Sequence, residues 1–139
     1  MTQYDPENIF AKILRGAMPA SKVYDDDVAL AFMDIMPRAP GHTLVIPKVA
    51  ARNLLDIAPA DLAQLTPRVQ HVAKAVKQAM DAEGIALYQF NEAPGGQVVF
   101  HLHFHIIPRW TGVAVKPPGE MGDRDQIEAA AAKIRAALA

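Results

Sequence analysis

Residues 101–107 read His-Leu-His-Phe-His-Ile-Ile, and this stretch carries the strongest signal in the chain. Side chains alternate between the two faces of a β-strand. We therefore predict a strand over residues 98–107 that presents three histidines on one face: His101, His103 and His105. Its other face points into the core with Leu102, Phe104 and Ile106. Neighbouring imidazoles then lie about 6–7 Å apart along a packed strand.

Such a row of histidines can be read in three ways. One or two of them could be structural residues held by hydrogen bonds. Two could share a metal ion with His42 as a further ligand, although the outer pair lies about 13 Å apart and the chain has no cysteine to complete the site. The third reading is chemistry on phosphorus.

Neutral imidazole is a nucleophile near pH 7 because its unperturbed pKa is about 6.5. Its attack on phosphorus gives a covalent phosphoramidate, which divides one difficult displacement into two easier ones. Neighbouring imidazoles can orient the nucleophile, bind phosphate oxygens or pass a proton to the leaving group. We favour this reading because it uses several imidazoles fixed on one surface.

The rest of the chain predicts an α+β fold, a small antiparallel sheet with helices packed on one face. Strand patterns cover residues 22–24, 28–34, 42–47, 85–91 and 98–107. The last two should form an antiparallel hairpin around a short turn at residues 93–96.

Apolar residues at helical spacing predict three helices. The first begins at Asp5-Pro6 and ends at Gly16. The second includes Leu62 to Met80, with a kink or break near Thr66 caused by Pro67, and stops at Gly84. The third covers residues 126–138 and is capped by Asp123.

Composition limits the class of protein. A chain of 139 residues predicts a single domain over residues 1–139. The absence of cysteine excludes disulfides and cysteine-based zinc sites. The net charge of −1 argues against nucleic acid as a partner. Residues 1–7 do not resemble a signal peptide and no apolar stretch is long enough to span a membrane, so we expect a cytoplasmic protein.

The histidine stretch and its flanks resemble the histidine triad (HIT) family, and within it the Hint-like branch. The family signature is His-φ-His-φ-His-φ-φ, where φ is apolar, as in residues 101–107. Before it stand Asn91-Glu92 and Gly95-Gly96-Gln97, and further upstream Phe32-Met33-Asp34-Ile35 and the run from Ala39 to Lys48. The resemblance covers residues 7–109 and leaves a tail and helix at residues 110–139 outside it.

The resemblance implies a role for each matching residue. His103 is implied to be the nucleophile that becomes nucleotidylated, His101 orients it, His105 contacts the phosphate, and His42 supports the triad. Asp34 is implied to bind the ribose hydroxyls, with Ile35 beside it. The phosphate-side loop would consist of Asn91, Gly96 and Gln97. The walls of the base pocket would consist of Ile9, Phe10, Ile13 and Phe32.

The resemblance further implies hydrolysis or transfer on nucleoside 5′-phosphoramidates or related adenylates, with an AMP-type purine nucleotide as ligand and without metal or cofactor. It also implies a homodimer whose two sheets join. Two alternatives stay open. Arg38, Lys48 and Arg109 could support hydrolysis of dinucleoside polyphosphates, or the chain could be an AMP-binding interaction protein with little catalysis.

The sequence departs from the Hint-like pattern at three places. Val98 stands where a serine or threonine is usual, and the resemblance assigns that hydroxyl a role at the phosphate or the leaving group. The loop before Gly95 is about one residue shorter. Some bacterial members of the family carry a zinc site that includes cysteine; this chain has no cysteine, so we expect no structural zinc. The tail after Trp110 is also unlike the Hint pattern, so substrate specificity transfers least.

Overall fold

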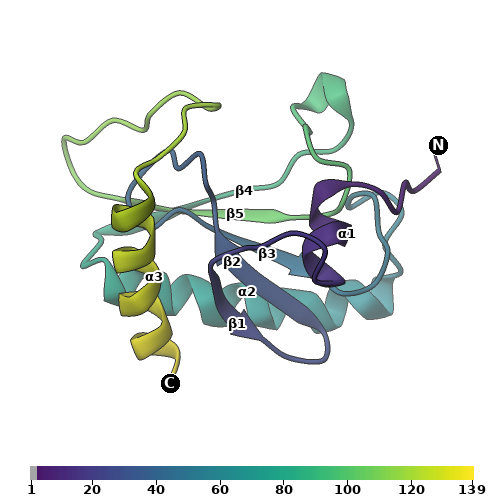
Figure 1. Ribbon diagram of the computed structural model, residues 1–139, viewed down its shortest axis with the longest axis horizontal. Helices are drawn as coiled ribbons and strands as arrows, with labels where there is room; N and C mark the ends of the chain where they lie inside the picture. Colours follow the sequence, from purple (N-terminus) through teal and green to yellow (C-terminus); the bar gives the residue numbers. More distant parts are fainter. Residues whose placement is uncertain (1–2) are drawn as a thin grey trace.

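Five antiparallel strands form the centre of the computed structural model, which describes residues 3–139 (Figure 1). The strands are β1 (Lys22–Asp25), β2 (Ala29–Met33), β3 (Thr43–Pro47), β4 (Gly84–Tyr88) and β5 (Phe104–Arg109). Their order in the sheet is β1-β2-β3-β5-β4. Residues 1 and 2, which belong to the segment in which no signal peptide was expected, lie outside the described residues.

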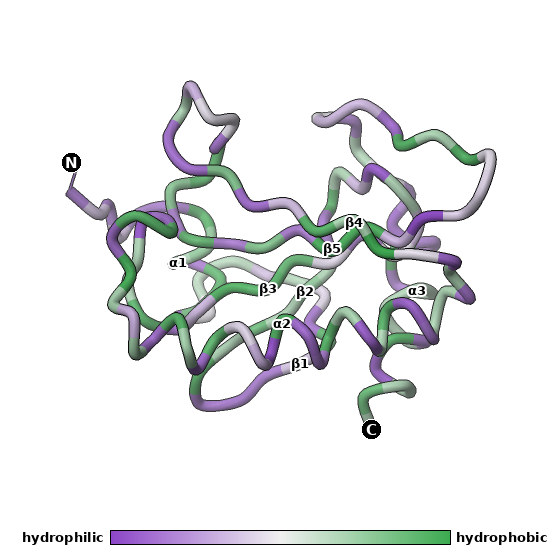
Figure 2. Tube along the Cα trace, turned by 180° about the vertical axis from the view of Figure 1, so that it is seen from behind, coloured by the Kyte–Doolittle hydropathy of each residue, from purple (hydrophilic) through white to green (hydrophobic). Residues whose placement is uncertain are grey.

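The two long helices, α2 (Pro59–Ala79) and α3 (Arg124–Leu138), cover one face of the sheet, as predicted. The short helix α1 (Ile9–Leu14) instead packs on the opposite face, where Phe10 and Ile13 contact the strands. The sheet is therefore buried on both sides at β2 and β3, where every residue is buried. Figure 2 shows hydrophobic residues along β3.

The helix ends differ from the sequence-based prediction at three points. Helix α1 starts after Asn8, whose side chain accepts the N–H of Ala11, so the predicted start at Asp5-Pro6 is wrong. Helix α2 continues through Pro67 without a break, with Leu65 and Val69 buried on either side of the proline. It ends at Ala79, before Gly84, because Asp81 takes a left-handed conformation (φ 48°) and turns the chain.

The predicted strand over residues 98–107 is also shorter than expected, because only its second half joins the sheet. Strand β5 begins at Phe104, and Leu102 donates its N–H to the carbonyl of Ala51 in a loop. Strands β4 and β5 are antiparallel, with Tyr88 opposite His105. However, residues 89–103, which include the 3₁₀ turn η1 (Ala93–Gly95), connect them in place of a tight hairpin turn.

The predicted alternation of faces in residues 101–107 is confirmed, although residues 101–103 lie outside β5. Leu102 and Ile106 are fully buried in the core beneath α2 and α3, and Phe104 packs against that core. Asp123 caps α3 as predicted by accepting the N–H of Gln126, although the helix begins at Arg124. Among residues 3–139, no helix combines the length and apolarity required to cross a membrane.

Candidate active site

The four histidines of the predicted site lie together on the α1 side of the sheet. His103 and His105 are edge-to-face neighbours, with ring centroids 4.9 Å apart. His42, at the start of β3, continues the row, with its ring centroid 5.2 Å from that of His105. His101 lies at the other end, where its ring is completely buried.

The hydrogen bonds of His103 define which of its nitrogens can react. Its Nδ1 lies 2.7 Å from the backbone carbonyl of His101. A carbonyl only accepts, so Nδ1 carries the proton in the neutral ring and Nε2 keeps a free lone pair. No hydrogen bond within residues 3–139 occupies that Nε2. His103 is therefore held in the tautomer that a nucleophile requires.

His101 is fixed by two further contacts. Its Nε2 donates to the carbonyl of Pro47 at 2.8 Å, so its Nδ1 must accept. The hydroxyl of Tyr4 donates to that Nδ1 at 2.6 Å. Tyr4 was not predicted from the sequence, because it lies 97 residues from its partner and belongs to no local pattern. Tyr4 and Pro47 together hold the residue whose carbonyl orients His103.

His42, His105 and Asp34 form a second connected group. The backbone N–H of Arg38 donates to His42 Nδ1 at 3.0 Å, so the proton of His42 is on Nε2. That Nε2 lies 3.0 Å from His105 Nδ1 and 3.4 Å from Asp34 Oδ2. His105 Nδ1 therefore accepts the His42 Nε2–H, so the proton of the neutral His105 ring is on Nε2, which can donate. A donor beside the His103 lone pair can bind a phosphate oxygen.

Burial keeps all four imidazoles neutral. It lowers the pKa of His42 and of His101 to about 4, and that of His105 to about 3. The positive charge of Arg38 acts in the same direction on His42 and His105. Burial also lowers the pKa of His103, although its bond to the His101 carbonyl acts against this. Because His42 is neutral, the 3.4 Å contact between its Nε2 and Asp34 Oδ2 is not an ion pair. Burial raises the pKa of Asp34.

Of the residues predicted to line a base pocket, Phe10 contacts His103 directly. Phe10 packs edge-on against His103, with centroids 4.9 Å apart, and against Phe32 at 5.3 Å. Phe10, Ile13 and Phe32 are buried and also belong to the core under α1. Ile9 and Ile35 are exposed, so these two offer open apolar surface near Asp34 and the α1 helix.

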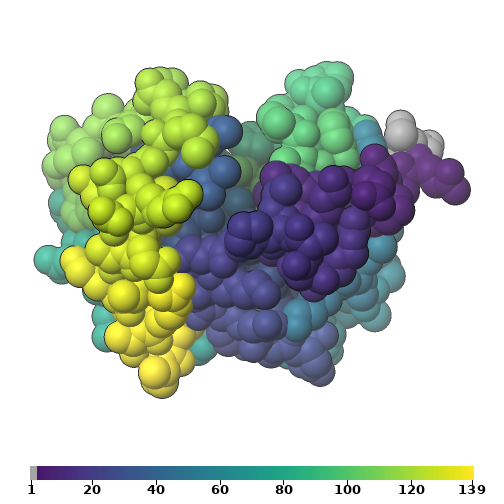
Figure 3. Space-filling view, in the orientation of Figure 1, coloured from purple at the N-terminus to yellow at the C-terminus, as the bar shows by residue number. Residues whose placement is uncertain are grey.

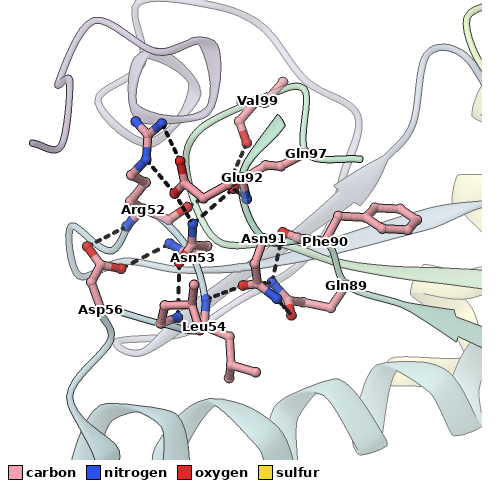
Figure 4. A network of polar contacts seen from close by, with 11 residues as sticks. Arg52, Asn53, Leu54, Asp56, Gln89, Phe90, Asn91, Glu92, Gln97 and Val99 are labelled. Atoms are coloured by element: carbon pink, nitrogen blue, oxygen red, sulfur yellow. Dashed lines mark hydrogen bonds and ion pairs between the residues drawn. The ribbon is translucent and has the colours of Figure 1, made fainter. Parts of the chain in front are cut away.

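The predicted phosphate-side loop is held by a polar network, shown in Figure 4. Gln97 is buried, and its side chain bonds to Glu92 N–H, Asn53 Nδ2 and the carbonyls of Arg52 and Val99. Both polar atoms of the Gln97 amide are therefore paired within the protein. Gln97 supports the loop.

Arg52 and Asn53 complete this network, and sequence reasoning missed both. Arg52 pairs with Glu92 through two hydrogen bonds of 2.8 and 2.9 Å, and Asn53 donates to the same carboxylate. These bonds hold Glu92 in a left-handed conformation, with φ of 65°. Asn91 is fixed by accepting the N–H of Leu54.

Gly96 has a φ of 103°, and an added Cβ would lie 3.2 Å from the ring of Phe90. The loop can therefore pass close to Phe90, which contacts His105 at a centroid distance of 5.7 Å. Phe90 is a further site neighbour that the sequence did not indicate. Val98 is 84% exposed and places no hydroxyl in this loop.

Asp34, His42 and His105 could together bind a metal ion instead of sharing a proton. Donor atoms of Asp34, His42 and His105 all lie within 4.8 Å of one another. A metal at His42 Nε2 would have to replace the proton that the Arg38 N–H bond places there. The hydrogen bonds therefore favour the proton-bearing arrangement over metal binding.

Comparisons with known proteins agree with this geometry. The family model of the HIT domain matches residues 15–112. A solved Hit-like protein from Bartonella henselae, described as involved in cell-cycle regulation and holding an unknown ligand, is 53% identical. It superposes with a TM-score of 0.94 over 99% of this chain and 100% of that one. A Zn-bound histidine triad protein from Mycobacterium smegmatis is 33% identical, with a TM-score of 0.83 over 95% and 93% of the two chains.

The adenylylsulfatase HINT3 of Arabidopsis thaliana is 39% identical over 73% of this chain and 51% of its own length. This chain thus corresponds to about half of that relative.

An antiparallel sheet that presents a row of buried, neutral histidines beside a glycine-bearing loop defines a protein of the histidine triad class. With the family model matching most of its length, the chain belongs to the HIT family.

Proposed function

We propose that this protein hydrolyses or transfers the nucleotidyl group of nucleoside 5′-phosphoramidates or related adenylates, through a covalent intermediate on His103. The observation that carries the proposal is the His103 tautomer. Its Nδ1–H is bound to the His101 carbonyl, which leaves the Nε2 lone pair next to the donor face of His105. HIT-family membership and the similarity to a relative named adenylylsulfatase support the same chemistry.

The remaining residues fit around this step. In this proposal the Asp34 carboxylate accepts hydrogen bonds from the ribose hydroxyls. Its Oδ1 already accepts the Met36 N–H, and burial raises its pKa. Ile9 and Ile35 offer apolar surface to a purine base. In this proposal the loop that contains Asn91, Gly96 and Gln97 binds the phosphate, mainly through its backbone N–H groups. None of these roles calls for a metal or cofactor, so we propose a metal-independent reaction on an AMP-type ligand.

The test is AMP release from adenosine 5′-phosphoramidate and adenosine 5′-phosphosulfate in EDTA, by the wild type and by His103→Ala. We expect turnover by the wild type, none by His103→Ala, and AMP binding by both. His71→Ala is the matched control, because His71 lies exposed on α2 and packs against Tyr24, away from the site. AMP binding without turnover by the wild type would favour an interaction protein, and cleavage restored only by added zinc would favour the metal alternative.

We further propose that the protein is a homodimer whose sheets join at β4. This strand is an edge of the sheet, and Leu87 on it is 51% exposed. An unpaired edge with an apolar side chain is suited to pairing with a second copy. Sedimentation equilibrium should give twice the chain mass, and Leu87→Lys should shift the protein toward the monomer. A monomeric wild type would contradict this proposal.

A further inference from the structure

The carbonyl that fixes the tautomer of His103 lies outside the sheet. It belongs to His101, whereas β5 begins only at Phe104, so no strand pairing holds the backbone at this point. The backbone there is anchored through Leu102, whose N–H donates to the Ala51 carbonyl at 2.8 Å. The position of the His101 carbonyl therefore also depends on what holds the His101 side chain.

Two hydrogen bonds hold the His101 ring, one at each nitrogen. Its Nε2–H donates to the Pro47 carbonyl at 2.8 Å, and its Nδ1 accepts the Tyr4 hydroxyl at 2.6 Å. The Tyr4 ring also packs edge-on against the imidazole, with ring centroids 5.7 Å apart. Because His101 is completely buried, solvent does not reach Nδ1 while the Tyr4 ring covers it. The Tyr4 hydroxyl is therefore the donor on which this nitrogen depends.

The segment that carries Tyr4 also contacts the nucleophile itself. Phe10, further along this segment in α1, packs edge-on against the His103 ring at a centroid distance of 4.9 Å. A turn in which the Asn8 N–H donates to the Asp5 carbonyl connects Tyr4 to α1. Figure 3 shows this segment and α1, in dark purple, as one continuous patch on this face of the molecule. One stretch of chain thus holds both His101 and His103.

We propose that Tyr4 is a positioning residue for His103 and acts through His101. The Tyr4 hydroxyl fixes the His101 ring, the ring fixes the His101 carbonyl, and the carbonyl keeps the His103 proton on Nδ1. This role deepens the proposed function and rests on it, because it assumes that His103 Nε2 is the nucleophile.

Loss of the Tyr4 hydroxyl leaves a buried nitrogen of His101 without its donor, which favours other orientations of that ring. The His101 carbonyl then no longer holds the His103 proton on Nδ1 alone. A His103 ring with its proton on Nε2 has no lone pair there and cannot attack phosphorus. The fraction of molecules with the reactive tautomer falls, and kcat falls with it, while the surface that binds the nucleotide is unchanged.

The experiment uses Tyr4→Phe, which removes the hydroxyl but keeps the ring that packs against His101. It should lower kcat for adenosine 5′-phosphoramidate by about ten- to a hundredfold, the effect of one unpaired buried group, with the Kd for AMP unchanged. Tyr24→Phe is the matched control, because it removes a hydroxyl that also forms a hydrogen bond of 2.6 Å, to Asp26, in and beside β1. It should leave kcat unchanged.

The second measurement reads the tautomer directly, by ¹⁵N NMR of the imidazole nitrogens in histidine-labelled protein, with His103→Ala to assign the signals. The wild type should show His103 protonated at Nδ1 only, and Tyr4→Phe should show a second tautomer protonated at Nε2. An unchanged kcat, an unchanged His103 tautomer, or a loss of kcat that only follows the loss of folded protein in circular dichroism would overturn the proposal.

A wild type without turnover would refute the proposed function, and the tautomer in Tyr4→Phe would then decide the role of Tyr4 by itself.

Discussion

The surroundings of His103 determine the protonation state and tautomer of its ring. Its proton is held on Nδ1 by a backbone carbonyl, and burial disfavours a second proton on the ring. Both effects keep the lone pair on Nε2 available. Residues that never touch a substrate, such as Tyr4 and Pro47, contribute by fixing the histidine that supplies this carbonyl.

The lowered pKa of His103 predicts the pH dependence of turnover. The nucleophile is lost only when the ring takes a proton, and burial moves this event below the usual value of about 6.5. We expect kcat/KM to be level above the usual imidazole pKa and to fall only at a pH below about 6.5. The measurement is the pH dependence of kcat/KM, with a substrate that has no pKa of its own in this pH range. Half-maximal activity at or above about pH 6.5 would contradict the assignment.

At the scale of elements, β5 and the extended segment before it join the site to the core. Leu102, between two site histidines, is completely buried against α2 and α3. The same backbone therefore packs one face and positions imidazoles with the other. Any change that displaces the packed face also moves the histidines.

Leu102→Asp should accordingly abolish folding, because it places a charge without a partner in the core. The expected loss of stability is several kcal/mol, about as large as the whole stability of a small domain. Circular dichroism and urea titration measure it. Val113→Asp is the control, since Val113 is 51% exposed and should tolerate the change. A Leu102→Asp protein with native stability would show that the two faces are wrongly assigned.

The alternation of apolar residues and histidines predicted these faces correctly, since a period of two survives even where the backbone leaves the sheet. The boundaries were harder to predict. Strand β5 starts late because Leu102 bonds to Ala51, a partner far away in the sequence. Helix α2 passes through Pro67 because tertiary packing outweighs local propensity. The roles of Tyr4 and Arg52 depend on contacts with residues far away in the sequence and could not be predicted from local patterns.

At the scale of the whole molecule, the buried histidines make stability depend on pH. In the unfolded chain these histidines have a pKa of about 6.5. In the folded protein the pKa of His42 and of His101 is about 4, and that of His105 is about 3. Between these values the unfolded state holds more protons, so acid favours unfolding. The raised pKa of Asp34 works in the opposite direction and offsets part of the effect.

We therefore expect the free energy of unfolding to decrease from about pH 7 to about pH 4, by roughly 1.4 kcal/mol per pH unit for each such histidine. Urea titrations at several pH values measure this slope. His101→Gln keeps a donor for the Pro47 carbonyl but cannot titrate, so its slope should be shallower than that of the wild type. Identical slopes would indicate that His101 is not buried as a neutral ring.

The network of Arg52, Asn53, Glu92 and Gln97 has an evolutionary consequence. Each side chain of this network forms a hydrogen bond or ion pair with at least one of the others. A single substitution therefore leaves an amide or a charge without its partner. Such positions are expected to change in concert or to remain fixed across descendants of a common ancestor. The loop of residues 91–97 would then diversify slowly, because a change at one of these positions requires a matching change at another.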